Sequence, residues 1–178
     1  MWSHCLLRRG MLPIDMLLAD LEARKTVRVP GLAVFMTREP EGAPVVLLHH
    51  LKHNKVLHEQ VVLLSILSEE VPEIPEDERI AIKKLSQGFY RIRARYGFME
   101  STNVPAILAR AREAGLEAKP LDTTYYLGRE QLIPTGTSRL WSWRKKLFVF
   151  MSRNSRSATA FYGIPPNRVV ELGAQLEF

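Results

Sequence analysis

Apolar residues recur along the first half of the chain with two different spacings, one typical of helices and one typical of strands. Residues 13–23 follow the i, i+3, i+4, i+7 spacing of an amphipathic helix, with apolar side chains at positions 14, 17, 18 and 21. Residues 31–36 form a short apolar run that predicts a strand, and Pro44 suits the first turn of a helix over residues 45–55. The near-continuous apolar run at residues 58–67 predicts a strand that is buried on both faces.

The second half of the chain repeats this alternation. Residues 79–98 predict two strands around a turn at Gln87–Gly88, because apolar and polar residues alternate there. Helical spacing returns at residues 103–116 and again at residues 138–151. Further strands are predicted at residues 123–134 and 169–178. Strands that alternate with helices indicate an α/β fold, a layered sheet of mixed, largely parallel strands with flanking helices.

Pro30–Gly31 marks a boundary in this pattern, because proline and glycine together punctuate regular structure. We place residues 1–30 in a lead-in, with its amphipathic helix at about residues 13–23, and residues 31–178 in one compact domain. The length suits this division, since domains commonly have roughly 100–200 residues.

Composition and charge narrow the class of protein. The single cysteine, Cys5, excludes an internal disulfide. The apolar runs are far shorter than the ~20 residues of a membrane-spanning helix. The net charge is +6 but unevenly spread: residues 31–89 carry six basic and nine acidic side chains, and residues 128–178 carry eight and three. A basic last third suggests an anionic partner or membrane surface nearby, and a solvated basic helix explains it equally well.

Four of the five histidines lie within residues 47–64, and their spacing raises the question of a metal site. His49 and His53 are four residues apart, a separation that can hold zinc on one helix face. The segment His58–Val62 begins like the zinc-protease motif His-Glu-x-x-His, but valine replaces its second histidine. No carboxylate lies within the helix to complete a ligand set. We therefore expect no metal here, and keep a metal hydrolase on His49, His53 and His58 as a lesser alternative.

No other set of catalytic residues emerges. Neither the phosphate-binding glycine motifs nor a Gly-x-Ser-x-Gly nucleophile turn is present, so we expect no enzyme. Nucleic-acid binding is a second lesser alternative, because Arg91, Arg93 and Arg95 alternate between Tyr90 and Tyr96. The modest overall charge argues against it, and we expect no nucleic-acid partner.

Several segments together resemble one family, in order and in spacing. They include "LLHHLKHNKVLHE", "YGFME", "FMSRN" and "IPPNRVVELG", and the resemblance extends from about Leu12 to the last residue. It is to the cytoplasmic C-terminal domain of the KUP/HAK/KT potassium uptake transporters. Such transporters carry potassium with protons through a bundle of membrane helices, which lipid requires because unpaired backbone groups find no partner there.

The resemblance implies that this chain is the cytosolic part of such a transporter, at the inner face of a bacterial plasma membrane. The ion pathway would lie wholly in the membrane bundle, so K⁺ and H⁺ would not bind here and no cofactor is expected. Residues 12–30 would connect the last membrane helix to the domain. Related domains are similar to the universal-stress α/β fold, form homodimers and can bind cyclic di-AMP, so the implied partners are the membrane domain, a second copy and that dinucleotide.

The resemblance also singles out polar residues within its segments. Candidates for an interface or a regulatory anion pocket are His49, Lys52, His53, Asn54, Lys55 and His58. Arg153, Asn154 and Arg168 would fix helix-to-strand packing or contact an anion. The leading hypothesis is a regulatory and dimerisation domain. Its alternative, a nucleotide or cyclic-dinucleotide sensor, predicts that Lys52, Lys55 and Arg153 surround one cleft.

Overall fold

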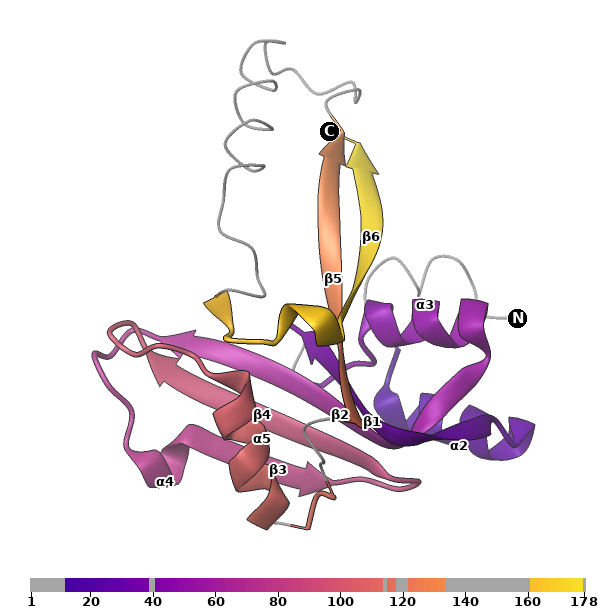
Figure 1. Ribbon diagram of the computed structural model, residues 1–178, viewed down its shortest axis with the longest axis horizontal. Coiled ribbons are helices and arrows are strands. Elements are labelled where there is room, and N and C mark those ends of the chain that lie inside the picture. The colour runs from indigo at the N-terminus through magenta and orange to yellow at the C-terminus, as the bar shows by residue number, and fades with distance from the viewer. Residues whose placement is uncertain (1–11, 39–40, 114, 118–121, 134–160, 178) are drawn as a thin grey trace.

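One mixed sheet organises the molecule (Figure 1). The computed structural model describes residues 12–38, 41–113, 115–117, 122–133 and 161–177. Within them the strand order is β3-β4-β2-β1-β5-β6, with β3 antiparallel to β4 and all other neighbours parallel. The strands are β1 (Val27–Thr37), β2 (Val56–Glu69), β3 (Ile80–Lys84), β4 (Phe89–Gly97), β5 (Thr123–Ile133) and β6 (Val169–Glu177). The predicted α/β class with a mixed, largely parallel sheet is confirmed.

Helices cover both faces of this sheet. The helices are α2 (Ile14–Arg24), α3 (Val45–Asn54), the single turn α4 (Glu76–Arg79), α5 (Val104–Glu113) and the 3₁₀ turn η2 (Pro166–Arg168). The apolar sides of α2 and α3 share one buried cluster, which includes Phe35 of β1 and Phe89 of β4. The apolar side of α5 belongs to a second cluster, with Ile92 of β4 and Leu64 of β2. Alternate residues of β1, β2, β4 and β5 supply the two clusters, as the two-residue period of a strand requires.

The sheet opens between β1 and β5. Those two strands pair only from Leu32–Phe35 to Thr123–Tyr126, whereas β5 pairs with β6 from Tyr125 to Ile133. Figure 1 shows the far halves of β5 and β6 rising together, away from the other four strands. From β1 the parallel strands β2 and β4 follow in one direction across the sheet, and β5 and β6 follow in the other direction. The strand order therefore reverses between β1 and β5, as in a doubly wound sheet.

Most predicted elements lie within a few residues of those observed. The helices predicted at 13–23 and 45–55 are α2 and α3, and the strand predicted at 58–67 is the longer β2. The helix predicted at 103–116 ends earlier, at Glu113. The helix predicted at 138–151 lies outside the described residues. The similarity to the universal-stress fold stays a prediction.

The strand predicted at 31–36 starts four residues earlier, at Val27, so Pro30–Gly31 lies inside a strand. A register shift between Val29 and Leu32 accommodates these two residues, as a β-bulge does. Gly31 has a φ of +106°, and a Cβ atom there would lie 2.8 Å from the Asp122 carbonyl oxygen. Glycine is therefore required by the close approach of a segment about ninety residues away in sequence. The division of the chain at residue 30 stays a prediction.

Candidate functional site

The histidine-rich helix α3 presents two different faces. Val46, Leu47, Leu48 and His50 are buried, whereas His49, Lys52 and His53 are exposed. The exposed rings of His49 and His53 lie parallel, with centroids 6.1 Å apart. The helix ends at Asn54. The next residue, Lys55, has a left-handed φ of 58°, and its amide donates to the Leu51 carbonyl oxygen at 3.2 Å, a common helix ending.

The buried His50 belongs to an aromatic cluster on the face of the sheet that α3 covers. Its ring centroid is 5.6 Å from that of Phe35 and 4.7 Å from that of Tyr126, both at edge-on angles. The Phe35 and Tyr126 rings stack at 4.6 Å, and the ring of His58 lies 6.4 Å from that of His50. Aromatic pairs favour these stacked and edge-on arrangements. The cluster joins α3 to three strands.

Burial favours the neutral form of both inner histidines, His50 and His58. Asn54 Nδ2 lies 2.9 Å from His50 Nδ1 and donates to it when the ring carries its proton on Nε2. Burial lowers the pKa of His50, the neighbouring His58 lowers it further, and the Val56 carbonyl opposes both. Burial likewise lowers the pKa of His58. Neutral rings among aromatic side chains suit packing, and Asn54 serves to orient His50.

The histidines do not converge on one point. His49 and His53 face outward, and His58 faces the buried His50. Among the described residues, no three His, Cys, Asp or Glu side chains lie close enough together to hold a metal ion. The arrangement that a hydrolase on His49, His53 and His58 would need is therefore not formed.

The remaining predicted residues are only partly placed. Lys52 and Lys55 are exposed at the end of α3. Arg168 is partly exposed in the turn η2, where its amide donates to the Pro165 carbonyl at 3.1 Å. Arg153 and Asn154 lie outside the described residues. The convergence of Lys52, Lys55 and Arg153 on one cleft stays a prediction.

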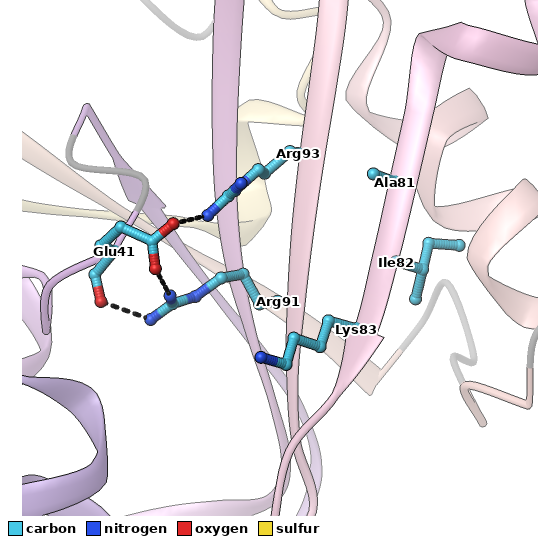
Figure 2. Close-up of a pocket in the computed structure, with 6 residues that line it drawn as sticks. All are labelled: Glu41, Ala81, Ile82, Lys83, Arg91 and Arg93. Carbon is cyan, nitrogen blue, oxygen red and sulfur yellow. Dashed lines mark hydrogen bonds and ion pairs between the residues drawn. The ribbon is translucent and has the colours of Figure 1, made fainter.

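A different polar cluster lies on the same sheet face, beyond α3, and sequence reasoning missed it. Arg91 of β4 is buried, and its guanidinium donates to Glu41 twice, to carboxylate Oε2 at 3.1 Å and to the carbonyl oxygen at 2.7 Å. Arg93 donates to the other carboxylate oxygen, Oε1. Figure 2 shows the Glu41 carboxylate between the two guanidinium groups, with Lys83 of β3 extending toward Arg91. The alternating arginines at residues 91–95 indicated a row of basic side chains on one face of the strand, but they gave no indication of their partner Glu41.

This geometry does not form the site that the nucleic-acid alternative needs at residues 90–96. Tyr90 and Tyr96 are buried on the α5 face, opposite to the arginines, so they cannot stack on bases that the arginines hold. Arg95 forms ion pairs with Glu69 at 3.0 Å and with Glu78 at 3.9 Å. Each of the three arginines of β4 thus contacts at least one carboxylate, and in this described segment they do not form a continuous stripe for a nucleic-acid backbone.

The segment "YGFME" forms a rigid turn after β4. The Glu100 carboxylate accepts hydrogen bonds from the amides of Gly97 at 2.8 Å and Ile74 at 3.1 Å, and pairs with Arg79. The Gly97 amide contributes most to lowering the pKa of Glu100, and Ile74 and Arg79 add to it. These contacts attach the turn to the loop after β2. They leave the side chains of Phe98 and Met99 exposed, at 64% and 71%.

Comparisons with known proteins agree on one family. The sequence matches the family model described as K+ potassium transporter C-terminal domain over residues 30–178. A "Probable potassium transport system protein Kup" from Anaeromyxobacter sp. (strain Fw109-5) is 56% identical across 97% of this chain. A protein of the same description from Myxococcus xanthus (strain DK1622) is 57% identical across 96% of this chain. A "Probable potassium transport system protein Kup 1" from Geobacter sulfurreducens is 57% identical across 93% of this chain.

The matched region is a minor part of these relatives. It covers 27%, 26% and 26% of their respective lengths, so this chain spans about a quarter of each protein. No solved structure matches the chain. In the described part of the chain, no helix is long and apolar enough to cross a membrane.

Proposed function

Because the chain belongs to the family of potassium-transporter C-terminal domains, we propose that it is the cytosolic regulatory and dimerisation domain of a proton-coupled potassium uptake transporter. The observation that carries this proposal is the family match, which extends over residues 30–178. The ion pathway would lie in the membrane domain of the same protein, and the domain would act on it without chemistry of its own. Its immediate partners are that membrane domain and a second copy.

The way the lead-in attaches to the sheet supports a regulatory role. Leu17, Leu18 and Leu21 of α2 are buried in the cluster that holds α3. The Gln87 side chain, in the turn before β4, donates to the Leu18 carbonyl at 2.9 Å. A lead-in joined this firmly to the domain would transmit displacements of the domain toward a preceding membrane segment. A ligand can use such a link only by binding one arrangement better than the other.

Rubidium uptake by the full-length transporter tests the proposal in cells that lack other potassium uptake. We compare the intact protein with a version that ends before residue 31, at matched amounts in the membrane. A regulatory domain predicts that the shortened protein still transports but no longer changes its rate when cytosolic conditions change. Unchanged regulation without the domain would refute the proposal.

The dimerisation part has its own measurement. Light scattering of the purified chain is expected to give twice the mass of one chain at micromolar concentration. A monomer at every concentration tested would remove the dimer while leaving the regulatory role to the uptake experiment.

The order of the strands favours nucleotide or cyclic-dinucleotide sensing as a second candidate. In doubly wound sheets ligands bind outside the carboxyl ends of the strands, where the order reverses. That point lies between β1 and β5 in this fold. Titration calorimetry of the wild-type chain with cyclic di-AMP and with ATP tests it. Micromolar binding of either nucleotide would support sensing, and the absence of binding by both would refute it.

A further inference from the structure

The Glu41 cluster lines a pocket on the sheet, and its basic groups come from two neighbouring strands. The pocket has a volume of about 290 Å³ and is lined by Glu41, Ala81, Ile82, Lys83, Arg91 and Arg93. Lys83 and Arg91 are directly opposite each other in the antiparallel β3–β4 pairing. Arg93 follows on the same face of β4, because side chains of a strand alternate between its faces. The paired strands therefore fix the backbone positions of the three residues that carry these cations.

The described lining of this pocket is mainly cationic. It contains the cationic side chains of Lys83, Arg91 and Arg93 and the carboxylate of Glu41. The Arg91 side chain is only 8% exposed, whereas the Glu41 side chain is 76% exposed. A buried guanidinium needs an anionic partner, because leaving it unpaired is strongly unfavourable. An exposed carboxylate, by contrast, returns to water with little loss.

We propose that this pocket binds an oxoanion of the phosphate type, and that the Glu41 carboxylate occupies the position of that anion when it is absent. Guanidinium groups present paired N–H donors that fit carboxylate and phosphate oxygens in the same way. A phosphate group carries more negative charge than a carboxylate and has oxygens left for Lys83. Release of Glu41 would also break the hydrogen bond from Arg91 to the Glu41 carbonyl oxygen, so this guanidinium would turn its freed N–H groups to the anion.

The exchange of Glu41 for an anion would reach the lead-in. Gly42 forms an isolated β-bridge with Pro13, and the Ala43 amide donates to the Leu12 carbonyl at 2.9 Å. The two residues after Glu41 thus pair with the residues just before α2. Movement of Glu41 out of the pocket loosens this contact. This coupling step rests on the proposed regulatory function, while anion binding itself does not.

Titration calorimetry of the 178-residue chain with sodium pyrophosphate at low ionic strength tests the binding. Glu41→Gln removes the internal competitor and keeps the size of the side chain, so affinity should rise at least about fivefold. Lys83→Ala should lower affinity about two- to fivefold. Lys84→Ala is the matched control, since its ammonium group lies 5.8 Å from the Tyr90 ring on the other sheet face, and it should leave affinity unchanged.

The results separate a built site from general charge attraction. Tighter binding by Glu41→Gln together with loss in Lys83→Ala alone establishes the site. Equal losses in Lys83→Ala and Lys84→Ala, unchanged affinity in Glu41→Gln, or no binding by any variant overturns it. A parallel flotation experiment with vesicles of phosphatidic acid in phosphatidylcholine identifies the source of the phosphate group. Binding to pyrophosphate alone identifies a soluble ligand, and Lys83-dependent flotation identifies a lipid headgroup.

Hydrogen exchange of the Ala43 amide tests the coupling independently. Pyrophosphate should accelerate its exchange severalfold, because the bond to Leu12 loosens when Glu41 leaves. If the anion binds as described and Ala43 stays protected, the coupling is wrong while the binding site stands. Failure of the uptake experiment with intact binding would instead refute the proposed function.

Discussion

Gly97 ends β4 in a position where any side chain should disrupt the turn that follows. A Cβ atom at residue 97 would lie 2.2 Å from the Pro72 carbonyl oxygen, 0.8 Å inside the 3.0 Å that real Cβ contacts respect. It would also lie 2.5 Å from the Pro72 carbonyl carbon and 2.6 Å from the Val71 carbonyl oxygen. All three atoms belong to the backbone, so no side-chain rotation relieves the contact. The loop after β2 must therefore withdraw in Gly97→Ala.

The withdrawal breaks hydrogen bonds that can be counted. The amides of Phe98 and Met99 donate to the carbonyls of Val71 and Pro72 at 2.9 and 3.1 Å. A shift of 0.8 Å carries both pairs past hydrogen-bonding distance. With a net contribution of about 1 kcal/mol per bond, Gly97→Ala should lower the free energy of unfolding by about 2 kcal/mol. Overpacking of well-fitted sites is typically unfavourable by a similar amount, roughly 1–3 kcal/mol.

Urea unfolding followed by circular dichroism measures this difference. Gly173→Ala provides the matched control, because it makes the same substitution in strand β6, where nothing in the described part of the chain lies within 4 Å of the added Cβ. That variant should stay within about 0.5 kcal/mol of the wild type. Equal stability of the two variants would refute the reasoning, since it would mean that the loop moves aside freely.

Three further outcomes are expected. Burial lowers the pKa of His50 and His58, so below their ordinary pKa of 6.5 the unfolded chain binds more protons than the folded chain. The free energy of unfolding should therefore be constant above pH 6.5 and decrease as the pH falls below it. The slope in urea unfolding should reach at most about 1.4 kcal/mol per pH unit for each neutral histidine, and a flat profile between pH 5.5 and 7.5 would contradict it. Leu17→Ala should cost about 2–5 kcal/mol in the same assay because Leu17 is 2% exposed, and Met16→Ala, at 59% exposure, should cost almost nothing; equal effects would show that α2 is no part of the folded core. Glu100→Gln should accelerate hydrogen exchange in the turn after β4, since the neutral amide pairs less well with Arg79, and unchanged protection would show that the carboxylate does not hold the turn.

Most helices and strands could be predicted from the sequence, because the residues that specify such an element lie within it or next to it. The apolar run of β2 lies within the strand that it specifies, and Pro44 lies directly before the first residue of α3. Gly31 shows where local information ends, because the requirement for it comes from the carbonyl of Asp122. The strand order is non-local in the same sense: β1 lies between β2 and β5, and its spacing pattern alone contains neither neighbour.

The histidines show that their clustering in the sequence does not separate exposed side chains from buried ones. His49 and His50 are adjacent in sequence, yet one is exposed and the other is 4% exposed. A signal was present, since His50 follows Val46 by four residues and Leu47 by three, which places it on the apolar side of α3. The ion pair of Glu41 with Arg91 had no such signal, because fifty residues separate its members.

These differences bear on where function lies in this domain. His50, Gly31 and Gly97 are unusual residues in sequence, and each is explained by packing or by a close backbone approach. The Arg91 ion pair is not explained in that way, because buried ion pairs are seldom better for stability than apolar residues of the same size. If stability alone determined the residue at position 91, an apolar side chain would be expected there. The buried Arg91 guanidinium pairs with an exposed carboxylate on a loop that contacts the lead-in. Stability alone does not account for this ion pair, whereas the proposed exchange of Glu41 for an anion would.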